Sequence, residues 1–131
     1  MCTRIINLTP HPINIIDPSD CHFNAAIRKM VANANVTPIA QIPSYGVVNA
    51  KMSNEQGTPI NGIPVMKKEI VDVEPLPEIE GDCIYVVSAL YATAFKRINS
   101  KSDVRLYTVA DPVYTEDGRT ILGSRGICEV F

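Results

Sequence analysis

Apolar residues along this chain fall into many short runs, and one run is followed directly by a helical pattern. Residues 83–87 (CIYVV) are continuously apolar, as is typical of a buried strand. Ser88 comes next and is well placed as an N-cap, because its hydroxyl can accept hydrogen bonds from free backbone N–H groups. Small alanines then alternate with the bulky Leu90 and Phe95, and two basic residues follow. The pattern predicts one main helix over about residues 88–98.

A second, weaker helical pattern covers residues 24–34. Apolar residues recur there at spacings of three and four, and Asn24 is a plausible N-cap. Two further asparagines near the end of the stretch are poor helix formers. The pattern therefore predicts a short, marginal helix.

The rest of the chain has the texture of strands separated by proline, glycine and Asp-Gly turns. The strands at 4–8 and 13–16 flank Thr-Pro-His-Pro and are expected to form an N-terminal hairpin. Further strands are expected at residues 39–42, 46–52, 63–73, 104–110, 112–115 and 121–130, with turns at 53–57 and 116–119 and an acidic, proline-rich connector at 74–81. Many short strands with two helices predict an α+β fold of mostly antiparallel strands, in one domain over residues 1–131.

Composition narrows the functional classes. The net charge is −2 and the basic residues are scattered, which argues against a protein that binds a nucleic acid polymer by neutralising phosphates. Two or three converging arginines would still hold a single charged nucleotide. The N-terminus lacks a signal-peptide core, and no apolar run is long enough to span a membrane, so a cytoplasmic protein is expected.

The four cysteines have no CxxC spacing, which favours reduced thiols over a metal site. No nucleophile stands in a recognisable catalytic motif such as GxSxG. The sequence therefore favours a protein that is not an enzyme. We expect no metal and no cofactor.

Two residues are candidates for contact with an anion or a ligand. The Ser88 helix N-terminus can hold a phosphate through its free N–H groups, although the glycines of a nucleotide-binding loop are missing and a plain N-cap explains the serine equally well. His11 lies between two prolines, where it can touch a ligand or simply orient the turn.

Arginines and tyrosines supply further candidates. Arg105, Arg119 and Arg125 lie in the C-terminal third, and arginine recognises phosphate through a two-pronged hydrogen-bonding fork. Arg125, between two glycines in GSRG, is the strongest of them, because glycine lets a ligand or a neighbouring chain approach the backbone. Arg119 lies in a predicted turn, so it could equally be a solvent-exposed residue that contacts no ligand. Tyr45 and Tyr91 could stack on a base or serve in packing.

Four stretches together resemble a family of small, mostly uncharacterised proteins of bacteriophages, prophages and bacteria. They are INLTPHPINII, IPSYGVVNAKM, EGDCIYVVSALYATA and DPVYTEDGRTILGSRG. Asn7 to His11, Ser88 and Gly118-Arg119 match the family pattern directly. Residues 18–36 look like an insertion, Ser44-Tyr45-Gly46 replaces Pro-Ser-Gly, and Ser124 stands where the family tends to have cysteine.

This resemblance implies an accessory protein of a mobile element, located in the host cytoplasm if a phage encodes it. Small phage proteins of this kind are similar to anti-defence sponges, which sequester cyclic nucleotide or cyclic ADP-ribose signals of bacterial immunity. The proteins that counter Thoeris signalling are one example. We therefore expect a non-enzymatic, oligomeric protein that binds a small nucleotide-derived ligand.

Two other hypotheses remain open at this stage. One is a protein–protein adaptor whose exposed strands pair with a partner. The other is a small, metal-independent phosphodiesterase that uses His11 as acid or base.

Overall fold

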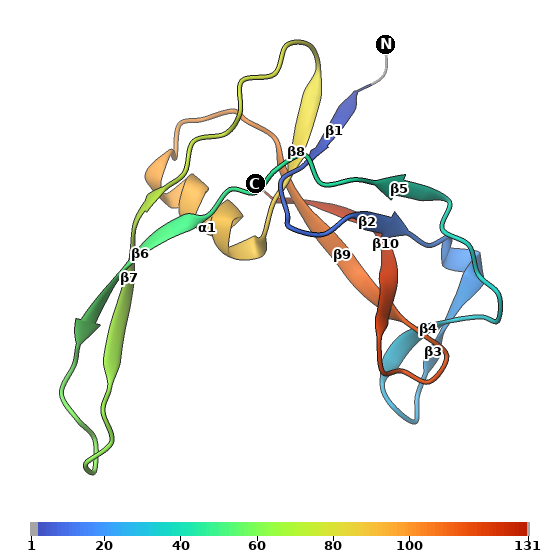
Figure 1. The fold of residues 1–131 in the computed structure, drawn as a ribbon, viewed down its shortest axis with the longest axis horizontal. Coiled ribbons are helices and arrows are strands. Elements are labelled where there is room, and N and C mark those ends of the chain that lie inside the picture. Colours follow the sequence, from blue (N-terminus) through green and yellow to red (C-terminus); the bar gives the residue numbers. More distant parts are fainter. Residues whose placement is uncertain (1–2, 131) are drawn as a thin grey trace.

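The computed structural model describes residues 3–130, and these form an α+β fold with a single helix (Figure 1). The strands are β1 (Arg4–Asn7), β2 (Ile13–Ile15), β3 (Cys21–Asn24), β4 (Lys29–Ala32), β5 (Ala40–Ile42), β6 (Ala50–Gln56), β7 (Met66–Val73), β8 (Cys83–Val86), β9 (Leu106–Tyr114) and β10 (Ile121–Val130). The helix is α1 (Ala89–Ile98), and a short 3-10 turn, η1, covers Pro18–Asp20. The predicted fold class and main helix are confirmed.

Eight strands form the main sheet. Its order is β1-β8-β9-β10-β2-β5, and β4 adds to β9 and carries β3 beside it. The longest ladder, β9–β10, is antiparallel, whereas β1–β8 and β8–β9 are parallel. Because β8 and β9 are parallel, the chain must cross over between them, and α1 makes that connection.

The helix forms where the sequence predicts it. The Ser88 hydroxyl accepts a hydrogen bond from the Tyr91 backbone N–H at 3.1 Å, and Lys96 and Arg97 lie in the last turn. Tyr91 and two of the alanines are fully buried, because small side chains let the helix lie close to its neighbours. Tyr91 and Ala92 belong to a core cluster with Ile6, Leu8, Val48, Val87, Phe95 and Leu106.

A second core cluster lies around β3, β4 and the far end of β9. It contains Ile16, Cys21, Ala32 and Val113, with Met30, Val36 and Leu122 packed against it. Burial of a large apolar side chain contributes on the order of 1.5–3 kcal/mol. The β3–β4 hairpin is therefore fixed to the main sheet by packing as well as by its pairing with β9.

The prediction of a helix at 24–34 is wrong, because this stretch belongs to the β3–β4 hairpin. Asn24 does not cap a helix; its side-chain oxygen accepts a hydrogen bond from the Ala26 N–H at 3.0 Å and shapes the turn. Val31 pairs with Tyr114 on β9 and is buried. Pairing with a distant strand has outweighed a weak local preference for helix.

The predicted N-terminal hairpin is also wrong. β1 pairs in parallel with β8, and β2 pairs with β10 and β5, so the two strands occupy different parts of the main sheet. The prolines do turn the chain between them. What the sequence could not show is that each strand finds its partner far along the chain.

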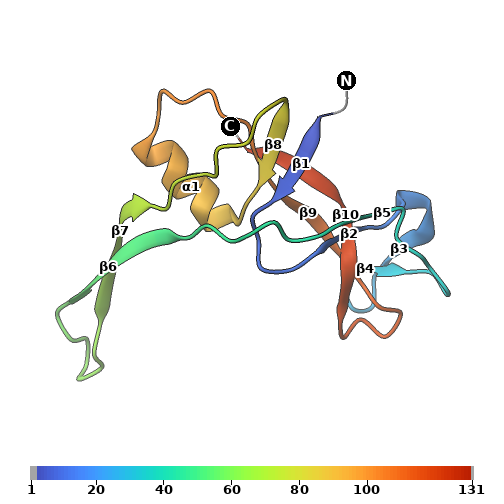
Figure 2. The same ribbon diagram turned by 45° about the horizontal axis from the view of Figure 1, so that its top comes forward.

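Strands β6 and β7 form a separate two-stranded sheet, the β6–β7 arm (residues 50–73), which projects from the rest of the molecule (Figures 1 and 2). The turn predicted at 53–57 is wrong: residues 53–56 belong to β6, and the chain reverses at Asn61-Gly62. Both of these residues have positive φ, at 50° and 76°. Asn-Gly is the sequence that such a turn favours, because neither residue resists the left-handed conformation strongly.

The C-terminal hairpin is confirmed, with one difference. The strands expected at 104–110 and 112–115 are a single strand, β9, which runs through Pro112. The turn at 116–119 joins it to β10, with Gly118 at a φ of 71°. Seen along its shortest axis, the molecule has the outline of an arch, with the β6–β7 arm at one end and the β3–β4 and β9–β10 hairpins at the other (Figure 1). No helix within residues 3–130 is long and apolar enough to cross a bilayer.

Candidate functional site

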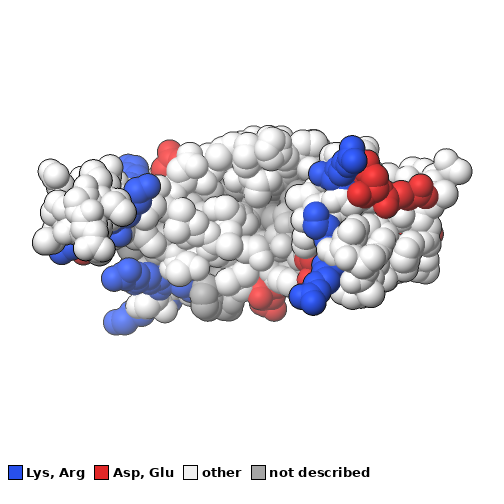
Figure 3. All heavy atoms as spheres, turned by 90° about the horizontal axis from the view of Figure 1, so that it is seen from below, with Lys and Arg blue, Asp and Glu red and all other residues white. Residues whose placement is uncertain are grey.

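A hollow of about 540 Å³ lies between the β3–β4 hairpin and the β9–β10 hairpin, and we call it the basic pocket. Three cationic side chains line it: Arg28, Lys29 and Arg125. Its other lining residues are Phe23, Met30, Asp111, Pro112 and Tyr114. Three cations against one carboxylate give the pocket an excess of positive charge in a chain whose net charge is negative. The space-filling view shows basic residues towards both ends of the arch, with acidic residues beyond them at one end (Figure 3).

Arg28 and Lys29 reach the pocket because the β3–β4 turn is tight. Asn24 pairs with Lys29, so only four residues connect the strands. Arg28 ends the turn with a φ of 55°, in the left-handed region. That conformation costs a residue with a side chain on the order of 1–2 kcal/mol. Such outliers concentrate at functional sites, where surrounding structure holds them in place.

Lys29 is held by two contacts. Its ammonium lies 4.4 Å from the centre of the Tyr114 ring, and it donates a hydrogen bond to the Gly118 carbonyl at 3.0 Å. A cation over an aromatic ring is attracted by the negative face of the π-system. Lys29 is therefore a positioned charge and not a freely moving one.

Arg125 lies directly across the β9–β10 ladder from Asp111, since Ser124 pairs with Pro112 and Gly126 with Ala110. The shortest nitrogen–oxygen distance between the two side chains is 3.7 Å, and both are well exposed. Exposed ion pairs of this kind contribute little stability. The guanidinium can therefore leave Asp111 for an anion at small cost.

Phe23 supplies an aromatic surface at the pocket. Its side chain is 60% exposed, which is unusual for phenylalanine, and it pairs across the hairpin with Met30. A flat, exposed ring beside three cations suits a ligand that combines negative charge with an aromatic base.

Of the residues singled out from the sequence, only Arg125 reaches the basic pocket. His11 lines a different hollow, beside β2 and β10. Arg105 forms an ion pair with Asp82 at 2.7 Å, where the chain enters β9 and β8. Arg119 is exposed in the β9–β10 turn, where its backbone N–H donates to the Asp117 carboxylate. A hydrogen bond from Thr115 and the Arg119 N–H lower the pKa of Asp117.

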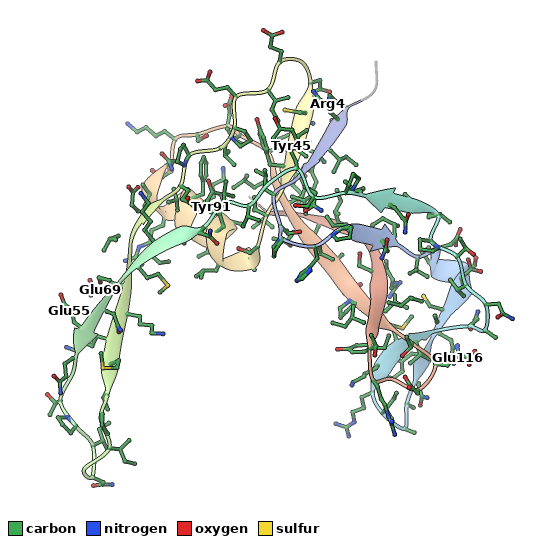
Figure 4. The ribbon with its side chains drawn as sticks, viewed as in Figure 1. Arg4, Tyr45, Glu55, Glu69, Tyr91 and Glu116 are labelled. Atoms are coloured by element: carbon green, nitrogen blue, oxygen red, sulfur yellow. The ribbon has the colours of Figure 1, made fainter. Side chains whose placement is uncertain are left out.

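The two tyrosines do not approach the basic pocket either. Tyr91 is fully buried, and its hydroxyl donates to the Glu74 carbonyl at 2.6 Å. Burial raises the pKa of Tyr91 to about 12. Tyr45 is exposed, but both tyrosines lie well apart from Glu116, at the turn next to the basic pocket (Figure 4). The structure thus assigns Tyr91 to packing, the alternative that its sequence context left open.

The Asn-Leu-Thr-Pro-His segment has a structural explanation. Asn7 is buried, and its side-chain amide donates to the carbonyls of His11 at 2.8 Å and Ile42 at 3.2 Å. Its side-chain oxygen accepts from the N–H and the hydroxyl of Thr9. One side chain therefore fixes the loop that carries His11 and ties it to β5.

Sequence reasoning missed Phe23, Arg28 and Lys29, because it placed them in or next to a helix. The available signal was Asn24, which favours turns as much as caps. Within residues 3–130, no cluster of three or more His, Cys, Asp or Glu side chains could hold a metal ion. Comparison of the chain with protein families, with curated proteins and with solved structures finds no match.

Proposed function

We propose that this protein binds a small, anionic, nucleotide-derived ligand in the basic pocket and holds it without cleaving it. The observation that carries the proposal is the convergence of Arg28, Lys29 and Arg125 with the exposed ring of Phe23 on one hollow. Its volume of about 540 Å³ lies in the range of sites for small molecules.

Each side chain has a distinct part in this proposal. Each of the guanidinium groups of Arg28 and Arg125 would donate two hydrogen bonds to two oxygens of one phosphate. Lys29 would add a fixed positive charge. Phe23 would stack on a base, an interaction that tolerates different bases because each has a π-face. A phosphate would compete with Asp111 for Arg125, which the loose 3.7 Å contact permits.

The ligand we propose is a cyclic nucleotide or cyclic ADP-ribose signal of bacterial immunity, sequestered by an accessory protein of a mobile element. This finer statement rests on the resemblance of the Asn7–His11, Ser88 and Gly118-Arg119 stretches to phage and prophage proteins. The cations of the basic pocket suit the negative charge of such a ligand, and Phe23 suits its aromatic base.

The phosphodiesterase hypothesis has less support. His11 and Arg125 line different hollows, so a histidine-based cleavage would act away from the three cations. The adaptor hypothesis draws on the β6–β7 arm, whose two strands pair with no third strand within residues 3–130. A stoichiometric protein partner in a pull-down from infected cells would favour it.

Ligand capture is tested by what the purified protein releases on denaturation. Mass spectrometry of the released small molecules, after incubation with a panel of cyclic nucleotides and cyclic ADP-ribose isomers, should recover one of them with unchanged mass. The same compound should raise the midpoint of thermal unfolding, since a ligand that binds only the folded state stabilises it. A cleaved product would favour the phosphodiesterase, and the absence of release and of stabilisation for every compound would contradict the proposal.

A further inference from the structure

The turn of the β3–β4 hairpin, residues 25–28, lies against the turn of the β9–β10 hairpin, residues 116–119 (Figures 1 and 2). Within residues 3–130, β4 and β9 pair at Val31 and Tyr114 alone, a bridge that lies outside both turns. Side chains therefore connect the turns themselves, and the basic pocket is lined from both hairpins. Two of these contacts end on Gly118.

The first contact is made by Ile27, which covers Gly118. The glycine is buried, although its neighbours Asp117 and Arg119 are exposed. Its φ of 71° lies in the left-handed region, and a Cβ at this position would overlap the Cδ1 of Ile27. Two requirements thus favour glycine here: a conformation that side chains resist and a contact that leaves no room for one.

The second contact is made by the carbonyl of Gly118. It accepts the hydrogen bond from the Lys29 ammonium at 3.0 Å, and the same ammonium lies over the Tyr114 ring. Ile27 and Lys29 are the chain neighbours of Arg28, which has the left-handed conformation at the end of its own turn. One glycine therefore fixes the residues on both sides of Arg28, although neither Ile27 nor Gly118 lines the basic pocket.

The β9–β10 turn is itself held by internal hydrogen bonds. The Gly118 N–H donates to the Thr115 carbonyl at 2.8 Å. The Asp117 carboxylate accepts from the Thr115 hydroxyl and from the Arg119 N–H. These bonds hold the backbone around Gly118 in one conformation, so its carbonyl is a fixed acceptor for Lys29.

We propose that Gly118 is a positioning residue of the basic pocket. Its contacts with Ile27 and Lys29, which we call the turn latch, join the two turns and hold Lys29 in place before a ligand arrives. A side chain that is ordered in advance loses less conformational entropy on binding, so the turn latch raises the affinity for an anion. This effect on affinity rests on the proposed function, whereas the position of Lys29 is testable without a ligand.

Gly118→Asn tests the turn latch, because asparagine tolerates the left-handed conformation but adds the Cβ that Ile27 excludes. The Tyr114 ring shields the ε-methylene protons of Lys29, so their NMR signals should lie upfield of those of exposed lysines. In Gly118→Asn these signals should move towards the position of exposed lysines. Gly62→Asn is the matched control, since Gly62 has a φ of 76° and no heavy atom within 4 Å of an added Cβ. It should leave the Lys29 signals unchanged.

Removal of the Ile27 side chain supplies a rescue. Gly118→Asn combined with Ile27→Ala has room for the new Cβ, so the Lys29 signals should return towards their wild-type position. Lys29 signals that Gly118→Asn leaves unchanged overturn the proposal, and so does a double variant no closer to the wild type than Gly118→Asn. Circular dichroism checks that each variant folds. If Gly118→Asn does not fold, folding of the double variant supports the turn latch, and misfolding of both overturns it.

Inorganic pyrophosphate is the probe for the effect on affinity. In the wild type it should shift the backbone amide signals of Arg28, Lys29 and Arg125. Gly118→Asn should weaken this binding about 2- to 10-fold, which corresponds to ordering one mobile side chain, and Gly62→Asn should bind like the wild type. No shift in the wild type would contradict the proposed function and not the position of Lys29. Equal affinity of Gly118→Asn and the wild type, with Lys29 displaced, would overturn the positioning role.

Discussion

Asn7 is a buried polar residue whose side chain bonds with backbone groups on two segments, the loop of residues 8–12 and strand β5. It donates to the His11 and Ile42 carbonyls and accepts from the Thr9 N–H, and it is only 1% exposed. A buried polar group without a partner is costly, so an asparagine with this many bonds fixes the local backbone. The Asn-Leu-Thr-Pro-His segment is thus explained by loop geometry, and no catalytic role is needed for its presence.

Replacing Asn7 by alanine should destabilise the protein substantially. The change leaves buried backbone groups unpaired, at about 1–3 kcal/mol each, so we expect the free energy of unfolding to fall by at least about 2 kcal/mol. Urea denaturation followed by circular dichroism measures it. Asn54→Ala, on the exposed face of the arm, is the control. A loss below about 0.5 kcal/mol for Asn7→Ala would contradict this role.

Tyr91 should make stability depend on pH in the alkaline range. Burial raises its pKa to about 12, so between pH 10 and 12 the unfolded chain loses this proton while the folded chain keeps it. Loss of a proton only in the unfolded state favours unfolding, and the stability present below pH 10 falls as pH rises towards 12.

Tyr91→Phe should therefore show a shallower loss of stability over this range than the wild type, by on the order of 2 kcal/mol in total. Urea denaturation at pH 9, 10, 11 and 12 measures the difference. The exposed Tyr45→Phe should behave like the wild type. Equal slopes for Tyr91→Phe and the wild type would show that Tyr91 titrates normally.

At the scale of elements, the sequence predicts those that carry a clear local signal. The helix after Ser88 and the β9–β10 hairpin depend on a local cap and a local Asp-Gly turn, and both are confirmed. The helix at 24–34 failed because Asn24 opens a local hairpin turn in place of a helix, and because Val31 on that hairpin pairs with Tyr114, 83 positions away. The basic pocket could not be predicted because its cations come from two hairpins that meet only in the folded chain. Arg125 alone was singled out, through the glycines that flank it.

Ser88→Ala separates the two interpretations of the strand–Ser–helix unit. The hydroxyl caps α1 by accepting from the Tyr91 N–H, so its loss should lower the free energy of unfolding by about 1 kcal/mol. If the ligand binds in the basic pocket, the affinity of the folded variant should be unchanged. Thermal unfolding and a binding titration on the same sample measure both. Weakened binding without a loss of stability would indicate that the ligand binds at the N-terminus of α1 and not in the basic pocket.

At the scale of the whole molecule, the arch keeps its two candidate surfaces apart. The basic pocket lies between the β3–β4 and β9–β10 hairpins, whereas the tip of the β6–β7 arm is at the opposite end (Figure 1). The basic pocket offers charge and an aromatic ring, whereas residues 57–66 at the tip of the arm carry no Asp, Glu, Lys or Arg. Their separation lets each surface be altered without the other.

The most direct test of ligand capture is isothermal titration calorimetry of the compound recovered from the release experiment, against the wild type and two arginine variants. Arg125→Gln removes a cation from the basic pocket, whereas Arg105→Gln removes one that is paired with Asp82 outside it. A charged hydrogen bond to phosphate contributes about 1.5–3 kcal/mol, so Arg125→Gln should weaken binding roughly 10- to 100-fold. Arg105→Gln should bind like the wild type. Equal affinity of Arg125→Gln and the wild type would contradict the proposed site.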